Sequence, residues 1–173
     1  MGSDANVVVR ELEADDDDAW EELARRLASV DADCFPSTSH RTGWNALATT
    51  PRLRRATKTF IARDGGGDVD GDVVGFLTMT TGSMECVVTK VAVTSSRRRE
   101  GVGRELVSAA IARAKDKRAR VVRLRVEIDN AAATTLYEAL GFEKETERGI
   151  VSDFYGAGRH AAQFALKLHE DFK

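Results

Sequence analysis

Hydrophobic and polar positions along the chain follow two different periods, the two-residue period of strands and the 3.6-residue period of helices. Short runs rich in β-branched residues predict strands at residues 7–12, 57–63, 73–80, 85–93 and 121–128. Helices are predicted at 19–27, 41–49, 102–114 and 131–140, and a closing pair of strands at 142–148 and 163–168. This order predicts a mixed α/β fold (α+β), a mostly antiparallel mixed sheet of about seven strands flanked by about four helices.

Turn and cap residues fall between these stretches. The Gly- and Asp-rich segment 64–72 joins two strands as a hairpin, and the acidic residues 15–18 supply the cap and first turn of the first helix. We find no internal repeat and no linker. The whole chain, 1–173, is therefore predicted to be a single domain, with short flexible ends at 1–5 and 169–173.

Composition and charge narrow the classes of function. The net charge of −2 gives no support for a nucleic-acid or membrane-surface role. No apolar run approaches the roughly 18 residues of a membrane helix. The two cysteines are too few for a disulfide framework, so a reducing, cytoplasmic location is expected, or an organelle if a transit peptide has been removed. No His, Cys or Asp cluster has metal-ligand spacing, so no metal is expected.

A basic, glycine-containing loop connects the strand at 85–93 to the helix at 102–114. It reads Arg98, Arg99, Glu100, Gly101, Val102, Gly103 and Arg104. A helix N-terminus presents unpaired N–H groups, and glycines let an anion approach the backbone, which suits a phosphate or pyrophosphate. A helix start with a solvated arginine cluster explains the same residues, and this motif alone leaves both interpretations open.

A second motif follows about thirty residues later. It consists of Asn130, Ala133, Leu136, Tyr137, Gly141 and Phe142. Together the two motifs resemble the GNAT (Gcn5-related N-acetyltransferase) family over residues 7–168. Within that family the chain is most similar to N-terminal protein acetyltransferases of the ribosomal-protein and Naa50-like kind. The resemblance implies an acyltransferase that uses acetyl-CoA as co-substrate.

The resemblance also implies roles for individual residues. Residues 98–104 would hold the pyrophosphate, and the backbone of Val91, Ala92 and Val93 would pair with the pantetheine arm and polarise the thioester carbonyl. Asn130 and Ala133 would contact the cofactor arm. Tyr137 would donate a proton to the departing thiolate. Phe35, followed by Pro36, and Tyr155 match the residues that contact a peptide acceptor.

The general base departs from the family pattern. Spacing places its two usual positions at Val87 and Arg125, neither of which can accept a proton. Glu85 and Glu127 are the nearest carboxylates, and each could equally form a solvated ion pair with a strand arginine. His160 is a third candidate, and His40 is a weaker one. The sequence therefore assigns no base.

Several acceptors remain open at this stage. The leading hypothesis is direct transfer of acetyl to a primary amine, either a protein N-terminus or a lysine. The alternatives are a small amine (an arylalkylamine, or a polyamine if the acceptor groove is acidic) and a non-catalytic acyl-CoA-binding module. A monomer or weak homodimer is expected.

Overall fold

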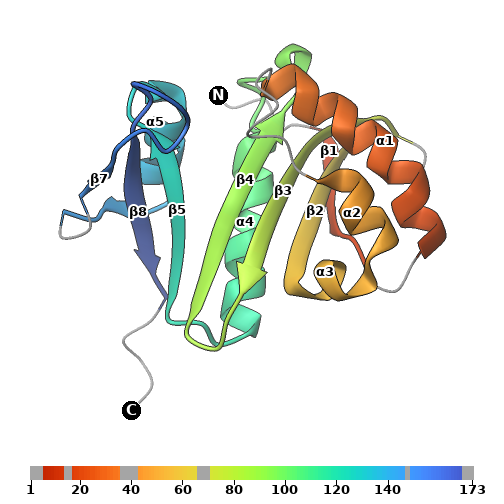
Figure 1. Cartoon of the computed structure of the whole chain (residues 1–173), viewed down its shortest axis with the longest axis horizontal. Coiled ribbons are helices and arrows are strands. Elements are labelled where there is room, and N and C mark those ends of the chain that lie inside the picture. The colour runs from red at the N-terminus through yellow and green to blue at the C-terminus, as the bar shows by residue number, and fades with distance from the viewer. Residues whose placement is uncertain (1–5, 14–16, 36–42, 66–70, 147–148, 169–173) are drawn as a thin grey trace.

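The computed structural model describes residues 6–13, 17–35, 43–65, 71–146 and 149–168. One eight-stranded sheet forms the centre of the molecule, with helices on both faces (Figure 1). The strands are β1 (Val7–Glu11), β2 (Thr57–Asp64), β3 (Val73–Thr81), β4 (Glu85–Val93), β5 (Val121–Glu127), β6 (Glu143–Lys144), β7 (Ile150–Val151) and β8 (Ala161–Lys167). The α-helices are α1 (Asp17–Cys34), α2 (Trp44–Thr49), α3 (Pro51–Ala56), α4 (Val102–Asp116) and α5 (Ala131–Ala139).

The sheet confirms the predicted fold class. Its order is β1-β2-β3-β4-β5-β8-β6, with β7 also paired to β8. All neighbours are antiparallel except β4 and β5, which run parallel. The strand predicted at 142–148 is wrong in extent, because two-residue strands β6 and β7 pair with different parts of β8. Gly149, directly before β7, has a φ of 59°, a backbone conformation that favours glycine.

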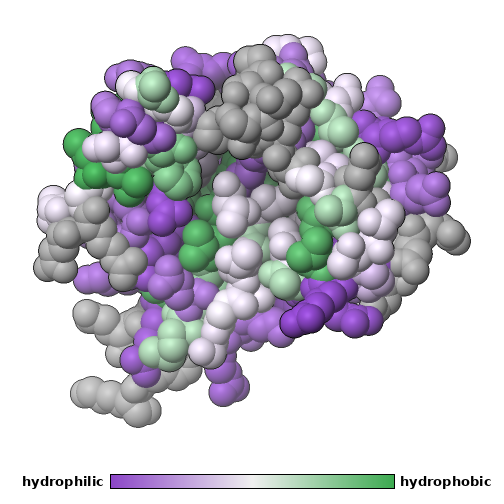
Figure 2. Space-filling model, in the orientation of Figure 1, coloured by the Kyte–Doolittle hydropathy of each residue, from purple (hydrophilic) through white to green (hydrophobic). Residues whose placement is uncertain are grey.

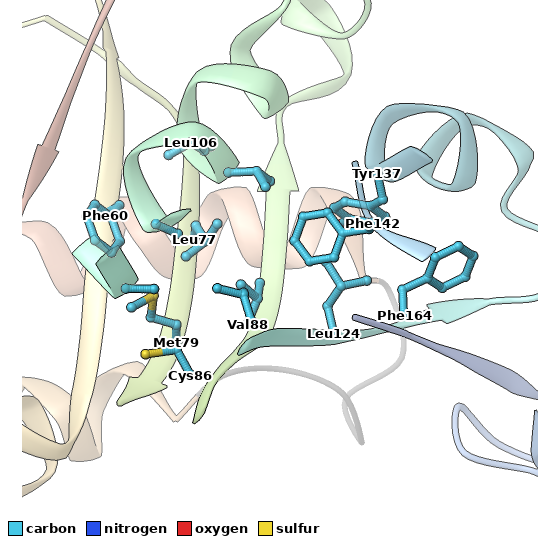
Figure 3. Packing of buried hydrophobic residues seen from close by; sticks show 14 of the residues in the cluster. Phe60, Leu77, Met79, Cys86, Val88, Leu106, Leu124, Tyr137, Phe142 and Phe164 are labelled. Atoms are coloured by element: carbon cyan, nitrogen blue, oxygen red, sulfur yellow. The ribbon is translucent and has the colours of Figure 1, made fainter. Parts of the chain in front are cut away.

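The helices on the two faces of the sheet pack against it to form two separate hydrophobic cores. Trp20, Leu23 and Leu27 of α1 pack with Phe76 of β3 on one face. Leu106 and Val107 of α4 pack with Leu77 and Met79 on the other face, in the core that Figure 3 shows. This second core continues under β5 to include Tyr137 and Phe142. The alternation along β3 therefore buries both faces of the central strand.

The first and second helical regions differ from prediction. Helix α1 continues past residue 27 to Cys34, because the apolar spacing continues through Val30. The helix predicted at 41–49 begins at Trp44 within the described residues, and a separate helix α3 follows it. Thr50 is extended between them, and Pro51 at the first position of α3 favours this new start. The predicted cap at residues 15–18 and the flexible ends lie mostly outside the described residues.

Strands β4 and β5 diverge after a short paired section. Only Glu85, Cys86 and Val87 pair with β5, opposite residues 121–123. On the other side of β4, the register with β3 shifts at Thr89, because Met79 faces Val88 while Thr78 faces Lys90. Such an extra residue is a β-bulge, which bends its strand. The two parallel strands consequently open into a wedge, visible between β4 and β5 in Figure 1.

Candidate functional site

A cavity of about 400 Å³ occupies the wedge between β4 and β5. Side chains from the end of α1, β4, β5, α5 and the loop before β8 surround it. Its lining is Cys34, Phe35, Val88, Thr89, Lys90, Val91, Leu124, Arg125, Val126, Glu127, Asn130, Ala133, Tyr137, Phe154, Tyr155 and Arg159. Because the sequence motifs on β4, β5 and α5 meet here, the cavity is the candidate active site.

Tyr137 lies at the wall of the cavity that α5 forms. Its side chain is 7% exposed, and its ring packs edge-on against Phe142 with the ring centroids 5.8 Å apart. Burial, with a smaller contribution from Tyr155, raises the pKa of Tyr137 above its ordinary value of 10.0. The phenol therefore remains protonated at neutral pH and can donate a proton inside the cavity.

Asn130 is a helix cap that also borders the cavity. It caps α5, where Oδ1 accepts a hydrogen bond of 3.0 Å from the backbone N–H of Ala133. Asn130 and Ala133 also line the cavity, next to Tyr137. The helix cap thus holds this end of α5 against the space in which a ligand would lie.

The basic loop is anchored by Arg97. This arginine forms an ion pair with Asp64 at the end of β2 and donates to Glu100 Oε2 at 2.7 Å. The Glu100 side chain is therefore engaged within the protein. Gly101 adopts a φ of 88° at the start of α4, and a Cβ added there would meet no protein atom within 4 Å. The loop backbone is open to a ligand.

The predicted arginines of the loop are solvent-exposed. Arg98, Arg99 and Arg104 are all exposed, and Arg99 has a φ of 71°. Arg98 turns back to donate from Nε to the Val93 carbonyl oxygen at 3.2 Å. Positive charge and open N–H groups thus gather at the N-terminus of α4, together with Val102 and Gly103 of its first turn.

The second half of β4 forms one wall of the wedge. Val91 lines the cavity, whereas Ala92 is buried on the face that α1 covers. The carbonyl oxygen of Val93 accepts hydrogen bonds from Arg98 and from Cys34 Sγ, the latter at 3.2 Å. Since β5 pairs with β4 only up to Val87, the edge beyond it is available to an extended ligand.

The four candidates for the general base lie in different places. Glu127 lines the cavity, and both of its oxygens accept hydrogen bonds from Arg159, at 2.6 and 2.7 Å. Glu85 lies at the paired end of β4, where it forms an ion pair with Arg123, and is not part of the lining. His160 Nδ1 accepts from the Asp153 backbone N–H. His40 lies outside the described residues.

The structure brings both predicted acceptor residues to the cavity. Tyr155 donates from its hydroxyl to the Arg125 carbonyl oxygen at 3.0 Å, and burial together with Glu127 raises the pKa of its phenol. The Phe35 ring lies 4.5 Å from Lys90 Nζ. Pro36 lies outside the described residues. Phe35 and Tyr155 therefore border the same space as Tyr137.

Sequence reasoning missed a buried ion pair behind the cavity. Asp31 is 1% exposed, and it accepts hydrogen bonds from Lys90 Nζ at 2.9 Å and from Trp44 Nε1 at 3.2 Å. Continued apolar spacing at Val30 could have extended α1 far enough to include Asp31. The bulge that turns Lys90 toward α1 leaves no such signal in the sequence.

Two kinds of feature are missing from the residues that the structure describes. No group of three or more His, Cys, Asp or Glu side chains is arranged to hold a metal ion there. In the same residues, no helix combines the length and apolar character needed to cross a bilayer.

Comparison with known proteins gives a family and a set of similar folds. Residues 18–142 match the model of the Acetyltransferase (GNAT) family. No curated protein sequence matches the chain significantly. The ribosomal-protein-S18-alanine N-acetyltransferase from Escherichia coli is 20% identical with a TM-score of 0.72, and the match covers 96% of this chain and 99% of that chain.

Two further solved structures have the same architecture. A chain of the NatC complex bound to Gag peptide and CoA is 22% identical with a TM-score of 0.70, covering 94% of this chain and 99% of that chain. Aminoglycoside 6'-acetyltransferase type Ii is 17% identical with a TM-score of 0.67, covering 92% of this chain and 96% of that chain. At these sequence identities the similarity shows the fold alone, and this fold is the one predicted from the sequence.

Proposed function

Because the chain belongs to the GNAT acetyltransferase family, we propose that it transfers acetyl from acetyl-CoA to the α-amine at a protein N-terminus. The observation that carries this choice of amine is that the cavity residues which the structure describes offer no free carboxylate or histidine as a base. Its lining contains one carboxylate, Glu127, which two hydrogen bonds tie to Arg159. The acceptor must therefore arrive with an amine that is already neutral.

The ordinary pKa values of amines make this requirement selective. An α-amine has a pKa of about 8, so about a quarter of it is neutral at pH 7.5. A lysine amine, with a pKa of about 10.4, is neutral to only about a thousandth. A site that removes no proton thus favours an N-terminus over a lysine by roughly two orders of magnitude at equal binding.

The residues around the wedge fit the acyl donor. Acetyl-CoA supplies an activated thioester. The open edge of β4 beyond Val87 can pair with its extended arm, and the loop at Gly101 can receive its pyrophosphate on backbone N–H groups. Tyr137 holds a proton at the cavity wall for the leaving sulfur. Phe35 and Tyr155 border the acceptor side.

The charge of the cavity argues against a polyamine acceptor. Its lining contains three cationic side chains, Lys90, Arg125 and Arg159, against the single carboxylate of Glu127. An acidic groove, which a polyamine would need, is not what these residues form. Repulsion between like charges in a partly desolvated site disfavours a polycation.

Release of CoA thiol with a panel of acceptors tests the proposal. Peptides with a free α-amine are expected to be acetylated, and the same peptides with a blocked N-terminus and an internal lysine are not. With an α-amine pKa of about 8, kcat/KM should rise about ninefold from pH 6 to pH 7 and about fivefold from pH 7 to pH 8, and then level off. Turnover of serotonin, spermidine or lysine in preference to α-amines would refute the proposal. CoA binding without any turnover would instead indicate a binding module.

Replacing Gly101 with alanine is expected to weaken CoA binding by roughly tenfold, the equivalent of one strong hydrogen bond. The new Cβ would point into the space that the loop leaves open, and the positive φ of 88° would also strain the backbone. Calorimetric titration with CoA measures the affinity.

Gly141→Ala is the matched control for this strain. Gly141 also has a φ of 88°, and it lies at the end of α5 opposite Asn130. Both variants should lose about 1 kcal/mol of unfolding free energy. Only Gly101→Ala should lose CoA affinity, and equal affinities would show that the loop does not hold the cofactor.

A further inference from the structure

The acceptor side of the cavity, bordered by Phe35 and Tyr155, contains three cationic side chains that differ in whether a carboxylate compensates their charge. Two of its three cations already have a carboxylate partner. Lys90 donates to the buried Asp31 at 2.9 Å, and Arg159 binds Glu127 with two hydrogen bonds. Each of these pairs is close to neutral as seen by a ligand. The charge that remains is that of Arg125.

Arg125 has a different environment from the other two. Its guanidinium carbon lies 5.0 Å from the centre of the Phe154 ring, and the residue is exposed. Within the described part of the chain, no carboxylate lies within ion-pair distance of it. Stacking on an aromatic ring holds a guanidinium in place while leaving its N–H donors available.

Arg125 lies on the part of β5 that borders the acceptor side of the cavity. It precedes Val126 and Glu127 on β5, and its own carbonyl oxygen accepts the Tyr155 hydroxyl. Val122, Leu124 and Val126 are buried toward α4, so Arg125 lies on the opposite face, where Lys90 meets α1. Figure 2 shows hydrophilic residues gathered over β5 and β8 on this face.

We propose that Arg125 selects acceptors that carry a carboxylate close to the amine. Such an acceptor is a protein N-terminus with an aspartate or glutamate among its first residues. The proposal rests on the proposed function and names its substrate class. A planar guanidinium binds a carboxylate through two parallel hydrogen bonds, and this geometry favours Asp or Glu over a neutral amide of the same shape.

Matched peptides and three variants test this selectivity. The peptides have Asp, Asn or Lys at position 1, 2 or 3 of an otherwise constant sequence, and kcat/KM is measured from CoA release. At one position at least, Asp is expected to exceed Asn by roughly tenfold and Lys by more. The Asp-to-Asn ratio should fall to near one in Arg125→Gln and to an intermediate value in Arg125→Lys, which keeps the charge but loses the planar pair of donors. In Arg125→Glu the preference should pass to Lys.

Arg52→Gln provides the control for a general loss of positive charge. Arg52 is exposed on α3 and does not line the cavity, so the Asp-to-Asn ratio should stay at the wild-type value. Equal turnover of Asp, Asn and Lys peptides by the wild type would overturn the selectivity while leaving N-terminal acetylation in place. Absence of turnover with every peptide would overturn both. An unchanged Asp-to-Asn ratio in Arg125→Gln would overturn the role of Arg125, because another residue would then bind the carboxylate.

Discussion

Replacing Tyr137 with phenylalanine is expected to lower kcat by roughly 100-fold while CoA binds with unchanged affinity. The change removes only the hydroxyl, and the ring remains packed against Phe142 in the core. Loss of a general acid typically costs a factor of about 10² to 10⁴. Single-turnover acetylation of a peptide measures the chemical step, and calorimetric titration measures CoA binding.

The pH dependence gives an independent check on the same residue. Burial raises the pKa of Tyr137 above its ordinary value of 10.0, so the proton that it donates is retained as the pH rises. The wild-type rate should therefore not fall between pH 8 and pH 10. An alkaline decline below pH 9 would indicate a different acid, as would a Tyr137→Phe variant with full activity.

Tyr155→Phe separates the two tyrosines of the cavity. This variant loses the hydrogen bond to the Arg125 carbonyl oxygen, which positions the loop before β8. We expect it to raise KM for the peptide more than it lowers kcat. If both variants lowered kcat equally, the roles assigned to Tyr137 and Tyr155 would not be distinct.

Replacing Asp31 with alanine is expected to lower the free energy of unfolding by about 3 kcal/mol. The change removes a carboxylate that is 1% exposed, and with it the acceptor for Lys90 Nζ and Trp44 Nε1. Removing one partner of a buried pair leaves the other charge poorly compensated. Urea denaturation followed by circular dichroism measures the loss.

Two further variants show whether the burial of the charge causes this loss. Glu22→Ala removes an exposed partner of Arg26 on the same helix and should change stability by less than about 1 kcal/mol. The double change Asp31→Leu with Lys90→Met removes both charges and should recover most of the stability. A loss below about 1 kcal/mol in Asp31→Ala would show that the pair does not stabilise the fold.

Much of the fold follows from local patterns in the sequence. The alternation in β2 and β3 and the helical spacing of Leu106 and Ala110 in α4 are confirmed at nearly their predicted bounds. The apolar residues of these elements form either a continuous buried run or a stripe at helical spacing, and both patterns can be recognised directly in the sequence. The last strands were predicted less well, because residues 143–144 and 150–151 each pair with a different, distant part of β8.

Residues of the candidate site that belong to a local motif could be named from the sequence, whereas those that depend on packing between distant segments could not. Gly101, Asn130 and Tyr137 belong to local motifs, and the structure places them at the loop, the helix cap and the cavity wall. The pair of Asp31 and Lys90 joins residues that are 59 positions apart. Only the three-dimensional path of α1 over β4 brings them together. Glu85 shows the converse, since proximity in sequence to the motif did not bring it to the cavity.

The bulge at Thr89 fixes which side chains face which side of β4. Before it, Cys86 and Val88 point toward the core under α4, and after it Lys90 and Ala92 point toward α1. If residue 89 were paired with β3 as an ordinary strand residue, the alternation after it would shift by one position. Lys90 would then face the apolar core, and Val91 would face α1. The bulge therefore places the positive charge of Lys90 on the side of β4 that faces α1 and Asp31, a placement that regular alternation from Val88 would not give.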